Sequence, residues 1–300
     1  MPPDIDGIHH VSTIVRDARA NRAFYTRSLG LRFVTRTVDF EDRFAYHLYY
    51  GDSSGRNGTV LTFFPFPDEV DGRVGRPQIA SAALAVPEGS LDVWTARFDR
   101  LGVEYDPVEE RFGEPVLPFR DPDGTHLELV EAEGVGEPWT EVIENEYAIR
   151  GIHGVSLLSA APFVTASLLE TFGLDRGRQE GDRVRYRTGT QVVDLLDRET
   201  AFGREGAGTH HHVAFAVPDE AALHDWRDIL AGRDDCRVSY VTDRHFFHSL
   251  YVRGDGGILF ELATASAGMA EYGGDADGLY LPPQFEEDRE VIESQLPPLE

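Results

Sequence analysis

Histidines cluster at two places in the sequence, and a glutamate interrupts an apolar stretch at a third. His10 ends a pair of histidines, His212 ends a run of three, and each is followed by a valine. Glu261 lies in the apolar segment 258–262, where a carboxylate needs a charged partner or a metal ion. Two imidazoles and one carboxylate form a facial triad that leaves positions on Fe(II) open for substrate and dioxygen. The three residues are therefore candidate metal ligands.

The elements that must position these residues recur within the chain. Residues 7–12 (GIHHVS) are repeated at 151–156 (GIHGVS), and each copy leads into a helix-like stretch that ends in Gly-Leu. Two further pairs of segments match: 85–88 with 216–219, and 120–129 with 253–262. Such repeats mark supersecondary units that bury their cores against one another. We expect four units, each made of a strand, a helix and several strands.

Within these units the ligand candidates fall on strands. The first strand of unit 1 carries His10, the first strand of unit 4 carries His212, and the last strand of unit 4 carries Glu261. Alternation along a strand allows all three to project to one face. Runs of β-branched and aromatic residues predict further strands at 59–64 and 192–196.

Three segments of the sequence predict helices. Asp17 is expected to cap a helix over residues 18–28, and Pro218 and Asp219 open one that runs to about Leu230. The C-terminal region predicts a short helix over 286–294.

The chain divides into two halves joined by the acidic stretch 133–147. We expect an N-terminal domain of two units over 1–140, a C-terminal domain of two units over 148–265, and a tail over 266–300.

The repeated segments and the positions of the histidines and the glutamate resemble those of the vicinal oxygen chelate superfamily. This superfamily includes glyoxalases, bleomycin-resistance proteins and extradiol ring-cleaving dioxygenases. The resemblance covers nearly the whole chain, and the segment 121–129 (DPDGTHLEL) looks like the end of a family module. It implies an α+β fold of four βαβββ modules, paired into two open, barrel-like domains. The subgroup that cleaves hydroquinone rings is a closer match, on segments that share its motifs: 9–11, 46–52, 58–65, 211–215 and 281–283.

The resemblance also implies site residues. Its metal ligands map onto His10, His212 and Glu261, and the fourth ligand position of a glyoxalase-type site holds Thr62. The cavity made from units 2 and 3 offers other residues at the ligand positions, and we expect no metal there: Ser81, Glu128, Gly154 and Asp194. Glu128 is then either exposed or paired structurally.

Further residues are predicted to act around the metal. In hydroquinone-cleaving relatives an arginine and a tyrosine precede the glutamate ligand, and they map onto Arg244 and Tyr251, which suit stabilisation of charge on ring oxygens. His9 and His211 flank two ligands as acid–base or substrate-binding candidates, although strict strand alternation would direct them to the opposite face. Ser12 shares the face of His10 and is expected to line the pocket.

The predicted function is an Fe(II)-dependent, extradiol-type ring-cleaving dioxygenase that acts on a hydroquinone or related dihydroxybenzene with O2. Mn(II) takes the same ligands. Two alternatives use the same fold: a glyoxalase-like metal-dependent isomerase or lyase, and a non-catalytic protein that binds aromatic or quinone-like compounds.

Charge and composition restrict the partners. The 300 residues contain 53 acidic and 28 basic side chains, all of the latter arginine, for a net charge of −25. Such a chain repels nucleic acid and anionic membrane surfaces. The charge predicts adaptation to concentrated salt, as in a halophile; a GC-rich genome with an ordinary acidic bias is the alternative. The single cysteine, Cys236, and a start that has no basic region and no apolar region favour a cytoplasmic protein, and a homo-oligomer remains open.

Overall fold

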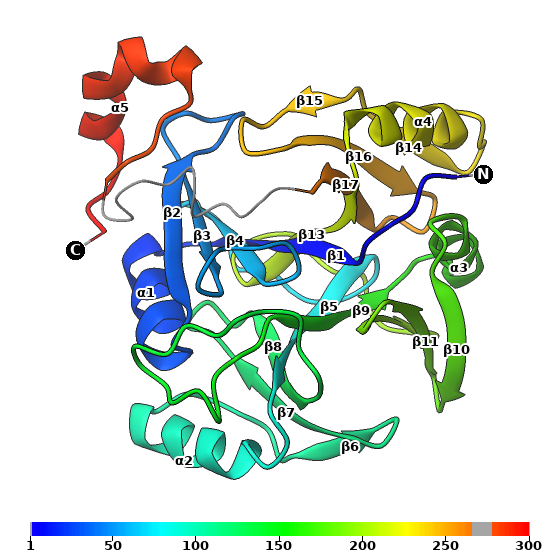
Figure 1. Ribbon diagram of the computed structural model, residues 1–300, viewed down its shortest axis with the longest axis horizontal. Helices are drawn as coiled ribbons and strands as arrows, with labels where there is room; N and C mark the ends of the chain where they lie inside the picture. The colour runs from blue at the N-terminus through cyan, green and yellow to red at the C-terminus, as the bar shows by residue number, and fades with distance from the viewer. Residues whose placement is uncertain (1, 266–277, 300) are drawn as a thin grey trace.

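The structure is a computed structural model that describes residues 2–265 and 278–299 (Figure 1). The predicted tail over 266–300 therefore lies partly outside the described residues. Within the described chain, seventeen strands form one hydrogen-bonded network, and helices flank it. The predicted class, a mixed fold built of four modules in open sheets, is confirmed.

Each module begins with a long strand that is followed by a helix. Module 1 has these elements: β1 (Ile8–Val15), α1 (Ala18–Ala23), a π-helical turn (Phe24–Ser28), β2 (Arg32–Val38), β3 (Tyr46–Gly51) and β4 (Val60–Pro65). Module 2 has these: β5 (Gln78–Val86), α2 (Leu91–Leu101), β6 (Glu109–Arg111), β7 (Glu114–Arg120) and β8 (His126–Glu131).

The second half of the chain repeats this order. Module 3 has these elements: β9 (Ile152–Leu158), α3 (Pro162–Thr171), β10 (Asp175–Glu180), β11 (Arg183–Thr188) and β12 (Gln191–Leu196). Module 4 has these: β13 (Thr209–Val217), α4 (Glu220–Ala231), β14 (Cys236–Val238), β15 (Thr242–Asp243), β16 (His248–Gly254) and β17 (Leu259–Thr264).

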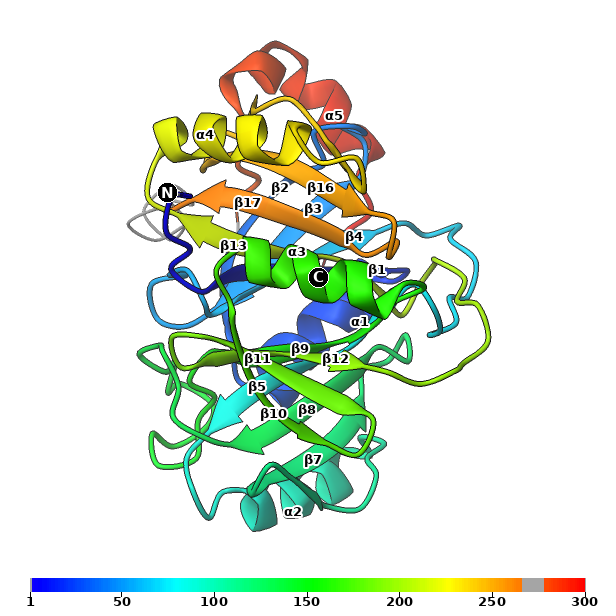
Figure 2. The same ribbon diagram turned by 90° about the vertical axis from the view of Figure 1, so that its right-hand side faces the viewer.

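Strand pairing joins the first module to the fourth and the second to the third. β1 pairs antiparallel with β13, while β4 and β17 lie parallel to β1 and β13 on the outer sides. In the other half β5 pairs antiparallel with β9, flanked by β8 and β12. Figure 2 shows the halves stacked, with α4 outside the upper sheet and α2 outside the lower one. The boundaries 1–140 and 148–265 stay a prediction, and the strand pairing crosses them.

Alternation along the strands separates an apolar outer face from a polar inner face. Phe215 on β13 and Phe260 on β17 point outward and pack against Phe172, which follows α3. Trp226 of α4 is fully buried and meets the same phenylalanine edge to face. Burial of these aromatic side chains, each contributing a few kcal/mol, fixes which face of β13 and β17 turns inward.

The helix caps follow the sequence signals. The Asp17 carboxylate accepts hydrogen bonds from the backbone N–H groups of Arg19 and Ala20, and that of Asp219 accepts one from Ala222. The stretch predicted as one helix over 18–28 changes from α to π geometry after Ala23.

The C-terminal segment packs near the loop between β2 and β3. A 3-10 turn (Pro283–Asp288) precedes α5 (Arg289–Gln295), so the predicted helix over 286–294 begins three residues later than expected. Phe285 meets Phe40 edge to face, and Asp288 forms an ion pair with Arg43. None of the described helices is long and apolar enough to cross a bilayer.

Candidate metal centre and substrate cavity

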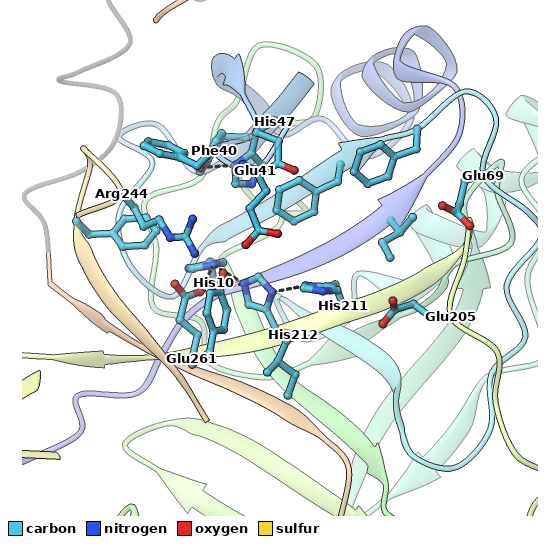
Figure 3. A pocket seen from close by; sticks show the side chains of 18 residues that line it. His10, Phe40, Glu41, His47, Glu69, Glu205, His211, His212, Arg244 and Glu261 are labelled. Carbon is cyan, nitrogen blue, oxygen red and sulfur yellow. Dashed lines mark hydrogen bonds and ion pairs between the residues drawn. The ribbon is translucent and has the colours of Figure 1, made fainter. Parts of the chain in front are cut away.

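Three buried side chains converge on the inner face of the half formed by modules 1 and 4. Glu261 Oε2 lies 3.1 Å from His10 Nε2 and 2.9 Å from His212 Nε2, and the two Nε2 atoms are 3.2 Å apart. All three residues are at most 2% exposed. Figure 3 shows the two imidazoles and the carboxylate pointing toward one another. The structure brings the predicted ligands together in one place.

Strand register explains this convergence. His10 on β1 lies opposite Ala214 on β13, and Ala214 lies beside Glu261 on β17. His212 is two residues before Ala214 on the same strand, so it shares the same face. Three adjacent strands therefore each supply one ligand.

A bulge on each central strand brings the neighbouring histidine to the same side as the ligand. The pairing of β1 with β13 slips by one residue at His9, and it slips again at His211. A bulge leaves an extra residue unpaired and redirects its side chain. Consequently His9 Nδ1 lies 2.8 Å from His10 Nδ1, and His211 Nδ1 lies 2.8 Å from His212 Nδ1.

These contacts are compatible with the tautomers that a bound metal ion would require. An imidazole that binds a cation through Nε2 keeps its proton on Nδ1 and donates it to a neighbour. His9 and His211 each offer Nδ1 as the acceptor, so each then carries its own proton on Nε2. Burial, and then the charge of His212, lower the pKa of His211 to about 4, which keeps its ring neutral near pH 7.

The carboxylate of Glu261 fits a bound cation. Its Oε2 is buried and accepts no hydrogen bond of good geometry from the described residues, although two imidazole nitrogens lie about 3 Å away. Burial by itself would raise the pKa of Glu261, but the charges of His10 and His212 hold it well below its usual range. A buried anionic oxygen facing two nitrogen ligands is stabilised by a metal ion between them.

The position of a fourth protein ligand carries a hydroxyl group. Thr62 on β4 is paired with Ser12 on β1, and their side-chain oxygens are 2.7 Å apart. Ser12 Oγ is also 2.9 Å from His212 Nε2. A neutral hydroxyl is a weaker metal ligand than a carboxylate, so this geometry favours three protein ligands and open positions on the ion.

A cavity of about 520 Å³ opens beside the triad. Its lining includes aromatic, histidine and acidic side chains from modules 1 and 4: Phe40, Glu41, His47, Tyr49, Phe64, His211, Phe247 and Tyr251. This volume is in the range of pockets that hold small organic ligands.

Arg244 and Tyr251 both line this cavity. Tyr251 on β16 is paired with Glu261 on β17, so the two side chains share a face. Arg244 lies in the turn between β15 and β16, and its guanidinium is 5.4 Å from the centre of the Tyr251 ring. Burial, and then the charge of Glu261, raise the pKa of Tyr251, so its hydroxyl stays protonated.

Comparison with known proteins places this geometry in a family. The model described as Glyoxalase/Bleomycin resistance protein/Dioxygenase superfamily matches residues 7–129. A Bacillus subtilis protein, described as "Putative ring-cleaving dioxygenase MhqO", is 41% identical over 303 residues, which cover 98% of this chain and 96% of the relative. The chain belongs to this superfamily. The membership predicted from its motifs is confirmed.

Other members of the superfamily refine the comparison. The "Chlorohydroquinone/hydroquinone 1,2-dioxygenase" of Sphingobium indicum is 30% identical over 278 residues, which cover 88% of this chain and 87% of the relative. A crystal structure described as a "putative dioxygenase" from Bacillus subtilis superposes with a TM-score of 0.94 at 40% identity, covering 99% of this chain and 98% of that one. Glyoxalase I from Zea mays, at 13% identity and a TM-score of 0.65, shares the fold.

Two of the predicted site residues lie behind the ligands. His9 is fully buried, contacts Phe247, and is absent from the cavity lining among the described residues. The geometry favours a positioning role for His9 over the predicted contact with substrate. Ser12 is likewise fully buried beneath His212, so its expected place in the pocket wall is taken by residues further along the strands.

Sequence reasoning missed the wall formed by β3 and β4. Phe64 and His47 stack with ring centres 4.1 Å apart, and the Tyr49 hydroxyl is 2.9 Å from His47 Nδ1. The alternation of His47 and Tyr49 along one strand was the available signal. It becomes useful only once β3 is known to pair with β4, and β4 with β1.

The half formed by modules 2 and 3 holds arginines at the place where the half formed by modules 1 and 4 has the candidate metal site. The repeat positions of the ligands are these: Ser81, Glu128, Gly154 and Asp194. Arg111 Nη1 lies 2.8 Å from Glu128, and Arg185 Nε lies 2.8 Å from Asp194. Guanidinium groups therefore neutralise both carboxylates. Of the two predicted states of Glu128, the paired one is confirmed and the exposed one is wrong, since Glu128 is 7% exposed.

Proposed function

We propose that this protein is a ring-cleaving dioxygenase that uses a divalent metal ion to cleave a hydroquinone-type dihydroxybenzene with O2. Fe(II) is the first candidate for this ion. One observation carries the proposal: Arg244 and Tyr251 line the same cavity as the converging ligands His10, His212 and Glu261. A cation, a protonated phenol and an incompletely coordinated metal ion are the groups that a phenolate substrate requires. Mn(II) suits the same ligands and is a second candidate metal.

The comparisons support the same reaction class. Relatives that match nearly the full length of the chain are described as ring-cleaving dioxygenases, and one is described as acting on chlorohydroquinone and hydroquinone. The hydroxyl pair of Ser12 and Thr62 disfavours the alternative of a glyoxalase-like isomerase, because such a site needs a fourth acidic ligand. The open cavity beside a preformed triad disfavours a purely sequestering protein.

Each side chain then has a distinct task. His10, His212 and Glu261 would hold the metal ion, which, when bound, brings a deprotonated ring hydroxyl and O2 together and allows electrons to pass between them. Arg244 stabilises negative charge on the ring oxygens, and the Tyr251 hydroxyl donates a hydrogen bond to the same region. His211 presents an Nε2 proton to the cavity and offers a second donor.

The net reaction requires no further co-substrate. One dihydroxybenzene and one O2 combine, the bond between a hydroxyl-bearing ring carbon and its neighbour breaks, and both oxygen atoms enter the ring-opened product. The four electrons needed to reduce O2 come from the ring itself. The proposed small-molecule partners are therefore the diol and O2.

Oxygen uptake tests this function. The protein is loaded with Fe(II) without oxygen, mixed with hydroquinone or catechol in multimolar KCl, and exposed to O2 at an electrode. We expect uptake of one O2 for each hydroquinone consumed, and formation of a ring-opened product by mass spectrometry.

Matched variants connect the uptake to the triad. Glu261→Gln should abolish uptake and lower the bound metal from one per chain toward zero. Glu128→Gln removes the carboxylate at the same repeat position in the half formed by modules 2 and 3. Once thermal unfolding shows that this variant is folded, it should keep both the oxygen uptake and the bound metal of wild type. Absence of uptake with both diols by metal-loaded wild type would contradict the proposal.

A further inference from the structure

His47 is an unused polar group in the wall of the substrate cavity. It is 9% exposed and lines the cavity, and its Nε2 is buried with no hydrogen-bond partner among the described residues. Figure 3 shows its ring on the side of the cavity across from His10 and His212. A buried ring nitrogen without a partner is costly unless a ligand or water satisfies it.

The orientation of this imidazole is fixed from two sides. Its ring stacks on Phe64 at an interplanar angle of 25°, and its Nδ1 is 2.9 Å from the Tyr49 hydroxyl. Burial raises the pKa of Tyr49 well above its usual range and lowers that of His47 well below it, so both groups are neutral. Tyr49 can therefore donate to Nδ1, which leaves the proton on Nε2, the ring nitrogen that has no partner among the described residues.

The sheet register sets the separation between His47 and the metal ligands. Ser12, Thr62 and Tyr49 form one row across β1, β4 and β3, and this row is level with His212. Ile14, Phe64 and His47 lie one inward-facing position further along the same strands. The two rows are roughly 7 Å apart along the strands, and β3 lies two strands away from β1 across the sheet. A ring whose first oxygen lies at the metal would extend from the first row toward the second.

A position across the cavity from the metal ligands suits a diol whose hydroxyls lie at opposite ends of the ring. A single ion can bind both oxygens of a 1,2-diol, but only one oxygen of a 1,4-diol, so the other must find a partner elsewhere. Phe64, which supports the His47 ring, adds an apolar side chain to the cavity wall at this end.

We propose that His47, oriented by Tyr49 and Phe64, binds the hydroxyl of a 1,4-dihydroxybenzene that lies farthest from the metal ligands. It thereby acts as a specificity-determining residue that favours 1,4-diols over phenols and 1,2-diols. This inference rests on the proposed function and names the substrate class of that site. A hydroxyl both donates and accepts, so it satisfies Nε2 in either tautomer.

Equilibrium binding without oxygen tests the contact independently of turnover. Isothermal titration of the Fe(II)-loaded protein with hydroquinone and with phenol compares ligands that differ by the one hydroxyl. We expect wild type to bind hydroquinone about three- to tenfold more tightly than phenol, the effect of one neutral hydrogen bond.

Variants of His47 assign that preference to a residue. His47→Phe keeps a ring to stack on Phe64 and should reduce the ratio of affinities to about one, with phenol binding unchanged. His47→Gln offers an amide near the position of Nε2 and should restore part of the ratio. His126→Phe removes an imidazole that lines the cavity of the other half and should leave the ratio intact.

Each result decides the inference. An unchanged ratio in His47→Phe, or an equal loss for both ligands, would overturn it. If His47→Phe does not fold, the wild-type ratio of hydroquinone to phenol remains decisive, and a value of one rejects the contact. A preserved ratio without oxygen uptake by wild type would contradict the proposed function but retain the contact.

Discussion

His10 and His212 are separated by 202 positions in the chain, yet their Nε2 atoms lie 3.2 Å apart. The antiparallel pairing of β1 with β13 creates this contact, and it joins strands that are farther apart in the sequence than the other strand pairs that carry these residues. The metal site therefore depends on correct association of the first and last modules. The Nδ1 of each of these imidazoles is then contacted by the histidine that precedes it.

Loss of the supporting imidazole should weaken metal binding. His9→Phe removes the acceptor for His10 Nδ1–H, and outer partners of this kind contribute about 10- to 100-fold to metal affinity. We expect a decrease of that size, measured by competition with a chromogenic chelator, with activity partly recovered at saturating Fe(II). His153→Phe, at the equivalent position of module 3, is the control. Equal affinities in all three proteins would show that His9 does not position the ligand.

Loss of Arg244 should lower kcat/KM and leave metal binding unchanged. Its Nε is buried without a partner among the described residues, and the side chain lines the cavity. Arg244→Met should lower kcat/KM for hydroquinone about 100-fold, the typical effect of removing one preorganised donor, while one metal ion still binds per chain. Arg253→Met, which removes an exposed arginine on the same hairpin, should behave as wild type. Loss of metal from Arg244→Met would indicate a structural role.

The sequence contained enough information to single out the three side chains that converge in the structure, because each sits at a repeated position on a strand of strong apolar character. It did not reveal that His9 and His211 each contact the imidazole of the next residue, or that His211 lines the cavity while His9 does not. Strict alternation places them on the opposite face, and the two bulges depend on tertiary pairing.

The cavity wall was hidden for a related reason. His47 enters the site only through the pairing of β3 with β4, and of β4 with β1. Arg244 lies in a tight turn where His245 has φ of 68°, a left-handed conformation that the sequence around it does not signal.

Stability should change with pH through a buried carboxyl in module 2, between β7 and β8. Burial, with a smaller contribution from Asp123, raises the pKa of Asp121 to about 6. A raised folded-state pKa means that the folded protein binds the proton more tightly than the unfolded chain, whose aspartates titrate near pH 4. The contribution of Asp121 to the free energy of unfolding is therefore fully present below about pH 4, and it is lost as the pH rises through 6.

Asp121→Asn isolates this effect from the general charge of the protein. Between pH 7 and pH 4 the wild type should gain on the order of 3 kcal/mol in unfolding free energy relative to Asp121→Asn, measured by urea denaturation. Glu88→Gln removes one exposed charge and should show no comparable pH-dependent difference from wild type. A constant difference between wild type and Asp121→Asn across this range would reject the assignment.

Salt should stabilise the folded state. The chain carries a net charge of −25 without a single lysine, so its surface repels itself at low ionic strength. At about 1 M salt the Debye length falls to about 3 Å, which screens this repulsion. We expect the free energy of unfolding to rise between low and multimolar KCl. Equal stability at both concentrations would contradict adaptation to salt and favour a compositional bias of the genome.

The acidic wall of the cavity should discriminate against anionic substrates. Arg244 is the one guanidinium among the described residues that line the cavity. In addition to Glu261, four carboxylates line it: Asp39, Glu41, Glu69 and Glu205. Glu41 and Glu205 are exposed, so their repulsion acts on an approaching ligand and is screened by salt. A neutral diol should therefore be preferred over the same diol with a ring carboxylate.

Competition between two diols measures this preference. At low salt we expect kcat/KM for hydroquinone to exceed that for 2,5-dihydroxybenzoate about tenfold, the effect of a few partly screened charges. The ratio should narrow in multimolar KCl, and also in the double variant Glu41→Gln, Glu205→Gln. Glu104→Gln removes an exposed carboxylate outside the cavity and should leave the ratio unchanged. If neither salt nor the double variant changes the ratio, the shape of the pocket, and not its charge, excludes the carboxylate.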